Sequence, residues 1–127
     1  MKAREPFPIV YVRDVARSER FYRDAFGFEP AFRWPAEGES TFVFLRLEPL
    51  GIAIGAADGE NVHGNPIRPG SGAFELCIYV DDIEEACARL RSLGAKELRP
   101  PVEEPWNESR AYFADPDGNT LHLARTS

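Results

Sequence analysis

The chain has 127 residues, of which 43% are hydrophobic and 28% charged, and its formal net charge is −6. A chain of this size buries roughly 65–70% of its unfolded surface, which suits one domain with its own hydrophobic core. The composition argues against a nucleic-acid partner, which requires a basic surface, and no apolar run approaches the ~20 residues of a membrane span. Two cysteines do not make a disulfide scaffold, and the first residues lack the apolar stretch of a signal peptide, so we predict a cytoplasmic protein.

The sequence contains an internal repeat. Residues 7–15 align with residues 75–83, with Tyr, Val and Asp at the same places in both copies. In each copy a helical stretch follows and stops at a glycine, Gly27 or Gly94, the residue that best adopts the left-handed cap after a helix.

The predicted elements occur in the same order in both copies. The first copy has a strand within residues 7–15, a helix at 16–26, and strands at 29–34, 41–48 and 51–56. The second has a strand within 75–83, a helix at 83–93, and strands at 96–100, 109–114 and 119–125. The turn before the last strand is Asp115-Pro-Asp-Gly118, in which proline and glycine supply the dihedral angles that a turn needs.

This order predicts an α+β fold built from two βαβββ modules. Module one covers residues 7–57, a linker rich in Gly, Pro and Asn covers 58–73, and module two covers 74–126, all within one domain, 1–127. A module of about 50 residues buries too little surface to be stable alone. We therefore expect the two modules to pair into a curved mixed sheet around a cavity, the kind of concave site that small molecules prefer.

Four motifs in this order carry a family resemblance: Val12-Arg-Asp14, Phe21-Tyr-Arg-Asp-Ala-Phe-Gly-Phe28, Val80-Asp-Asp-Ile83 and Asp115-Pro-Asp-Gly-Asn119. Together they resemble the vicinal oxygen chelate superfamily, which includes glyoxalase I, extradiol dioxygenases, fosfomycin-resistance enzymes and bleomycin-binding proteins. The resemblance implies the two-module fold and a homodimer. It does not select a reaction, because this scaffold hosts several reactions as well as plain ligand binding.

The resemblance also implies where a metal would be held. Enzymes of the superfamily bind a divalent ion through His or Glu on the first and last strands of each module, leaving positions open for substrate oxygens. These positions fall on Phe7 and on Ala53 or Gly55, which have no donor atom, and on Glu75 and His122, which do. Because two ligands make a weak site, we expect no metal cofactor. The alternative is Fe, Mn, Ni or Zn bound by Glu75, His122 and a third ligand.

The segment from Glu104 to Leu123 is similar to the C-terminal segment of bleomycin-binding proteins. Those proteins carry a Pro-Trp loop and a final-strand His, and they are metal-free dimers that sequester a flat, partly cationic drug. Here the loop is Pro105-Trp106, although Asn107 replaces the family's glycine and the following arginine is displaced to Arg110. The resemblance implies that Trp106 forms a wall against which a planar ligand stacks.

Glu75 is the most informative single residue. Strand alternation places it on one face with Tyr79, as it places Phe7 with Tyr11, so each aromatic ring is either core or cavity wall. A carboxylate on an apolar strand is costly unless it faces a cleft or is paired, and its candidate partners are His122, Arg110, a cationic ligand or a metal. A hydrogen-bonded Glu75–His122 pair would also have the make-up of a general base.

We therefore predict a small-molecule-binding protein, a homodimer that sequesters an aromatic or cationic compound without a metal, as antibiotic-resistance proteins do. The predicted ligand-binding residues are Phe7, Tyr11, Trp34, Glu75, Tyr79, Trp106, Arg110, Tyr112 and His122. One alternative is a metal-dependent lyase, isomerase or dioxygenase of the same superfamily that uses Glu75 and His122. The other is an enzyme that uses this pair without a metal.

Overall fold

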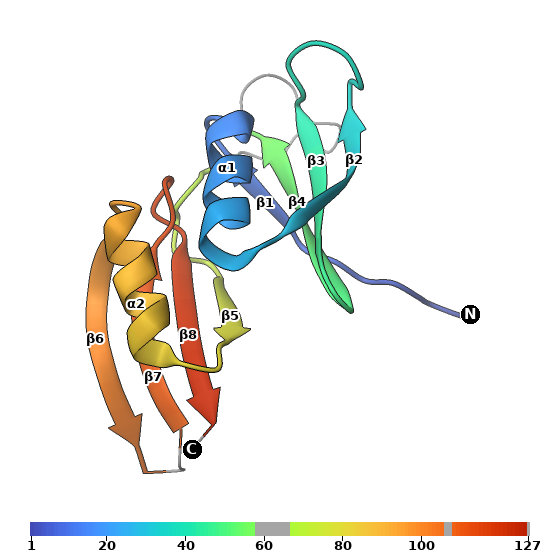
Figure 1. The fold of residues 1–127 in the computed structure, drawn as a ribbon. Coiled ribbons are helices and arrows are strands. Elements are labelled where there is room, and N and C mark those ends of the chain that lie inside the picture. The colour runs from blue at the N-terminus through green and yellow to red at the C-terminus, as the bar shows by residue number, and fades with distance from the viewer. Residues whose placement is uncertain (58–66, 106–107, 127) are drawn as a thin grey trace. The chain divides into compact units, whose positions relative to one another are not determined.

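The computed structural model describes residues 1–57, 67–105 and 108–126 (Figure 1). The chain divides into two compact units, the N-terminal unit (residues 1–69) and the C-terminal unit (residues 70–127). The N-terminal unit contains β1 (Ile9–Val12), α1 (Val15–Phe26), β2 (Glu29–Trp34), β3 (Phe42–Leu47) and β4 (Leu50–Ala56). The C-terminal unit contains β5 (Glu75–Tyr79), α2 (Ile83–Ser92), β6 (Lys96–Glu104), β7 (Glu108–Ala114) and β8 (Thr120–Thr126). Within these described ranges, neither helix is long and apolar enough to cross a membrane.

Both units have the same topology. The strand order is β1-β4-β3-β2 in one sheet and β5-β8-β7-β6 in the other. In each sheet the first and last strands of the unit pair in parallel, and the remaining neighbours pair antiparallel. This confirms the predicted α+β fold of two βαβββ modules.

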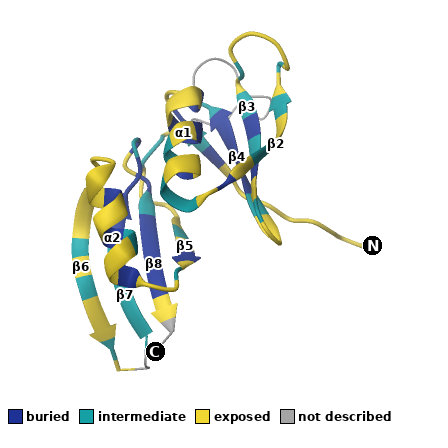
Figure 2. Cartoon of the chain, in the orientation of Figure 1, coloured by how far each residue is buried: buried dark blue, intermediate teal, exposed yellow. Residues whose placement is uncertain are grey.

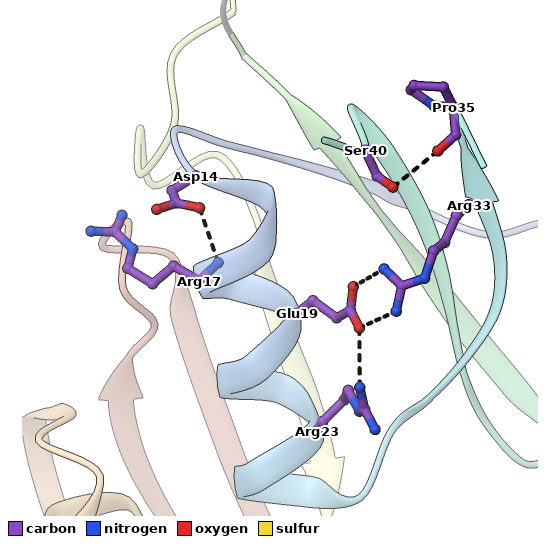
Figure 3. Close-up of polar contacts among 7 residues, drawn as sticks. All are labelled: Asp14, Arg17, Glu19, Arg23, Arg33, Pro35 and Ser40. Carbon is purple, nitrogen blue, oxygen red and sulfur yellow. Dashed lines mark hydrogen bonds and ion pairs between the residues drawn. The ribbon is translucent and has the colours of Figure 1, made fainter. Parts of the chain in front are cut away.

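Local side-chain chemistry sets where the helices begin and end. The aspartate that recurs in the repeat is the N-cap of both helices, since Asp14 accepts a hydrogen bond from the main-chain N–H of Arg17, and Asp82 one from that of Glu85, each at 3.0 Å. Figure 3 shows the first of these caps. Helix α1 ends at Gly27, whose φ of 82° lies in the left-handed region predicted for that position.

One face of each sheet packs against the helix of its own unit, and there the hydrophobic core lies (Figure 2). In the N-terminal unit the fully buried side chains on the strands include Val10, Val12, Val43, Leu45 and Ile54. In the C-terminal unit they include Ala111, Phe113, Leu121 and Leu123, packed with Cys87 and Leu90 of α2. Because strand side chains alternate, the opposite face of each sheet carries a different set of residues. We call these the N-terminal open face and the C-terminal open face.

A buried carboxylate ties the edge strand β2 to helix α1 (Figure 3). Glu19 accepts hydrogen bonds from both terminal nitrogens of Arg33, one at 2.6 Å, and from Arg23 at 3.3 Å. The hydrogen bonds from Arg33 outweigh the burial of Glu19 and lower the pKa of its carboxyl group. Because Arg33 points toward the helix, its neighbours Phe32 and Trp34 point to the N-terminal open face.

The strand limits agree with the sequence prediction to within one residue, with two exceptions. Strand β1 begins at Ile9, so Phe7 precedes it. Strand β6, which was predicted to end at Pro100, continues through Pro101 to Glu104. The pairing of β6 with β7 shifts register between Arg99 and Val102, and such an irregularity accommodates residues that have no N–H to donate.

Candidate functional site

The C-terminal open face carries a band of polar and aromatic side chains. The strand register places Cys77 of β5 beside His122 of β8, and His122 beside Tyr112 of β7. Tyr112 in turn pairs with Arg99 of β6, so the band crosses all four strands. The remaining members of this face, by alternation, include Glu75, Tyr79, Glu104, Glu108 and Arg110.

Glu75 and His122 contact each other at 3.1 Å, between Oε1 of the carboxylate and Nδ1 of the imidazole. Because a carboxylate only accepts, Nδ1 carries the proton in this contact, and Nε2 of the neutral ring carries the lone pair. The His122 side chain is 7% exposed and that of Glu75 50% exposed. Among the described residues, Nε2 of His122 has no hydrogen-bond partner although it is buried.

The imidazole is held by a stack of planar groups. The rings of His122 and Tyr112 lie 4.6 Å apart between centroids, with an angle of 29° between their planes. On Tyr112 lies the guanidinium of Arg99, 5.6 Å from the ring centroid, which is the geometry of a cation–π contact. Arg99 is itself held by Glu104, whose Oε1 accepts from Nη2 at 2.5 Å.

A second network lies on the same face. The hydroxyl of Tyr79 donates to one oxygen of Glu108 at 2.8 Å, and Arg110 donates to the other at 3.1 Å. Tyr79 and Arg110 each donate to the Glu108 carboxylate, and in each case this hydrogen bond raises the pKa of the donor. Cys77 is a free thiol on this face, and its pKa is raised mainly by partial burial, against the opposing charge of Arg110.

The N-terminal open face is aromatic instead. It holds a groove of about 470 Å³, here called the aromatic groove, whose lining includes Phe7, Phe32, Phe42, Phe44, Arg46 and Leu50. Phe7 meets Phe44 edge to face at 5.0 Å between centroids, and Phe32 meets Phe42 in the same way at 6.3 Å. The guanidinium of Arg46 lies 5.8 Å from the centroid of the Phe44 ring.

Small residues on β4 make room for these rings. A Cβ atom at Gly51 would lie 2.6 Å from the ring of Phe44, and one at Gly55 would lie 3.2 Å from the ring of Tyr11. Larger side chains at these two positions would therefore displace the aromatic residues that cover them.

The structure brings some of the predicted site residues together. Glu75, Tyr112 and His122 are in direct contact in a chain, and Tyr79 and Arg110 are linked through Glu108. Phe7 lines the aromatic groove, Tyr11 covers Gly55, and Trp34 is exposed at the end of β2. Trp106 lies outside the described residues. That these residues bind a ligand stays a prediction.

Sequence reasoning missed several members of the two faces: Phe32, Phe42, Phe44, Arg46, Arg99 and Glu108. For β3 a signal was present, because the alternation in Phe42-Val-Phe-Leu-Arg46 puts two phenylalanines and an arginine on one face. For Arg99 there was none, since its contact with Tyr112 depends on the register between β6 and β7.

Only some of the residues at the implied metal positions have an atom that could bind a metal. Phe7, Ala53 and Gly55 carry no donor atom, whereas Glu75 and His122 are adjacent donors. Within the ranges that the structure describes, no group of three or more His, Cys, Asp or Glu side chains could hold a metal ion. The described residues thus offer two of the three or four donors that a stable protein site uses.

Comparison with known proteins identifies relatives of the whole chain. The family model described as Glyoxalase/Bleomycin resistance protein/Dioxygenase superfamily matches residues 7–123. The lactoylglutathione lyase of Schizosaccharomyces pombe is 26% identical over 141 residues, covering 94% of this chain, which spans only 46% of that protein's length.

Solved structures show the same fold at lower identity. TioX from Micromonospora sp. ML1 superposes with a TM-score of 0.78 at 20% identity, covering 95% of this chain and 98% of TioX. The fosfomycin resistance protein FosX from Listeria monocytogenes superposes with a TM-score of 0.76 at 17% identity, covering 100% and 96% of the two chains.

Proposed function

Because the chain belongs to the Glyoxalase/Bleomycin resistance protein/Dioxygenase superfamily, we propose that it binds an aromatic or cationic small molecule without a metal ion. The observation that carries this proposal is the aromatic groove. Phe7, which stands at the first implied metal position, is one of its walls, and the ring of Phe44 packs on Phe7. At this position the N-terminal unit therefore has a hydrocarbon side chain on which a flat molecule can pack, whereas the enzymes of the superfamily have a side chain that binds the metal.

The size of the groove sets what it contributes to affinity. A flat ligand that buries about 150 Å² of apolar surface gains roughly 4 kcal/mol, which offsets only the low end of the roughly 4–15 kcal/mol that association costs in lost freedom. Favourable ring contacts add about 0.5–1.5 kcal/mol. Tight binding therefore needs polar contacts as well.

We place the biological role with the resistance branch of the superfamily. FosX is a fosfomycin resistance protein, and the family name includes bleomycin resistance. In this role the protein sequesters a toxic compound, and it acts as a homodimer. The two edge strands of each sheet, β1 and β2 in one and β5 and β6 in the other, are available for such pairing. Light scattering of the purified protein would measure the oligomeric state.

The binding proposal is tested with flat three-ring dyes. Acridine, N-methylacridinium and 9-aminoacridine share one ring system, and their own fluorescence reports binding. We expect saturable binding of at least one dye, and Phe32→Ala should raise its Kd about fivefold, the loss of one stacking side chain. The matched control is Leu93→Ala, which removes an exposed apolar side chain after α2. Absence of saturable binding, or equal loss in both variants, would refute the proposal.

The second candidate is a metal-dependent lyase, isomerase or dioxygenase. It is favoured by the adjacency of Glu75 and His122 at 3.1 Å and by the similarity to a lactoylglutathione lyase. Mass spectrometry of untagged protein exposed to Fe(II), Mn(II), Ni(II) or Zn(II) and then desalted distinguishes the candidates. Near-stoichiometric metal that is lost in His122→Ala would favour the enzyme and overturn the metal-free proposal.

A further inference from the structure

The charges on the C-terminal open face are unevenly paired. Arg99 pairs with Glu104 at 2.5 Å and Arg110 pairs with Glu108 at 3.1 Å, so each of these carboxylates faces a guanidinium. Glu75 instead faces the imidazole of His122, and half of its side chain is exposed. The strand register also places Lys96 in line with Glu75 across the sheet, but three strand spacings of about 4.8 Å separate the two residues. The excess negative charge of this face is therefore concentrated at Glu75.

The orientation of His122 adds a second feature at the same place. Its ring is stacked on Tyr112, and Tyr112 is covered by Arg99, which Glu104 holds in place. When the ring is neutral and Nδ1 is directed to Glu75, the buried Nε2 is an acceptor that has no partner among the described residues. A buried acceptor without a donor is unfavourable, so the site gains when a donor reaches it.

From this arrangement we propose that the C-terminal open face binds a guest that carries a cation with N–H groups, such as a protonated aromatic amine. Glu75 is its counter-ion, and Nε2 of His122 accepts a hydrogen bond from it. Arg99 and Tyr112 are positioning residues that hold the imidazole in the required orientation. Glu75 is half exposed and is reached directly, whereas Nε2 is buried, so the side chains that cover it must move before the guest reaches it. This inference rests on the proposed function and names the chemical class of the ligand.

The three dyes separate the charge from the hydrogen-bond donor. Above neutral pH acridine is uncharged, N-methylacridinium is a cation whose ring nitrogen has no hydrogen, and 9-aminoacridine is a cation with N–H donors. We expect 9-aminoacridine to bind most tightly, N-methylacridinium next, and acridine at least about tenfold more weakly than 9-aminoacridine, the usual scale of one charge-assisted hydrogen bond. Glu75→Gln should abolish the preference for the two cations.

The control for Glu75→Gln is Glu97→Gln, which removes the same charge from a residue that pairs with Arg91 of α2. This variant should keep the preference for cations. If all three dyes bind the wild-type protein equally, and Phe32→Ala weakens them equally, the proposed function stands and the present inference is wrong. If none of them binds, both are wrong.

The positioning role is tested by nitrogen NMR of the imidazole. The chain has only two histidines, so His63→Gln assigns the two sets of signals. We expect His122 to show the tautomer with the proton on Nδ1, and 9-aminoacridine to shift the Nε2 resonance. Tyr112→Leu should mix the tautomers and reduce the preference for 9-aminoacridine over acridine several-fold, whereas Tyr112→Phe, which keeps the ring, should preserve both.

Arg99→Met tests the same positioning role. Because the Arg99 side chain is more than a third exposed, this variant remains informative if Tyr112→Leu does not fold. We expect it to shift the tautomer and the preference in the same direction as Tyr112→Leu, by a smaller amount. A variant that weakens all three dyes equally and leaves the tautomer unchanged would show that the stack is only structural, which would overturn the positioning role.

Discussion

The ion pair between Glu19 and Arg33 gives a quantitative test of how β2 is held. The Glu19 side chain is 8% exposed, whereas those of Arg33 and Arg23 are 38% and 46% exposed. Breaking a fully buried pair costs about 3–5 kcal/mol, and breaking an exposed one costs about 0.2–1 kcal/mol. Because the arginines regain water in Glu19→Gln, and glutamine keeps one acceptor oxygen, we expect the free energy of unfolding to fall by about 2 kcal/mol.

Urea unfolding at several pH values measures this effect. Since the pKa of Glu19 is lowered from its ordinary value of 4.5 in the folded protein, its stabilising contribution is fully present above pH 4.5. It is lost as the pH falls through the folded-state pKa. The difference between wild type and Glu19→Gln should therefore be largest near neutrality and should shrink in acid.

Two further variants complete the test. Glu84→Gln, on the surface of α2, should change the free energy of unfolding by less than about 0.5 kcal/mol. In a double-mutant cycle, Arg33→Met should cost much less in the Glu19→Gln background than in the wild type. A loss for Glu19→Gln that stays the same from neutral to acid pH, or additive effects of the two substitutions, would refute the assignment of the stability to this ion pair.

Three other outcomes are expected. Gly51→Ala, whose Cβ would lie 2.6 Å from the Phe44 ring and 2.7 Å from the Leu45 carbonyl oxygen, should cost about 1–3 kcal/mol in thermal unfolding and weaken acridine binding; unchanged binding would contradict the groove. Cys77 should react with iodoacetamide slowly at neutral pH and faster only above the usual thiol range, because burial raises its pKa; the pH profile of an ordinary thiol would contradict this. Asp115→Ala should lower the free energy of unfolding by about 2–4 kcal/mol, since its carboxylate accepts three hydrogen bonds within the turn; chemical unfolding at the wild-type midpoint would contradict it.

The sequence was most informative where the determining interactions are local. The repeat predicted two βαβββ modules, and the aspartates and the glycine that mark it are the caps of the helices, at Asp14, Asp82 and Gly27. A cap acts over three or four residues of chain, so its pattern is visible without knowledge of the fold. The same holds for the Asp115–Gly118 turn.

Sequence reasoning was less successful where two strands must be aligned. The predicted strand ended at residue 100, but pairing with β7 carries β6 on to Glu104. For the same reason the aromatic groove was only partly anticipated. Phe7 was predicted as a site residue, whereas Phe32 and Phe44 join it through the register of β2 with β3.

The Glu75–His122 pair shows most clearly which features are visible in the sequence and which depend on the fold. Glu75 and His122 were identified from the sequence as the donor-bearing residues at the implied metal positions, because the family resemblance matches these positions one by one without knowledge of the fold. The fold was needed to show that they touch, that Tyr112 stacks on His122, and that Arg99 covers Tyr112. The first contact joins strands that are distant in sequence, and the other two depend on the register between neighbouring strands, which is set by which face of the sheet is buried against its helix.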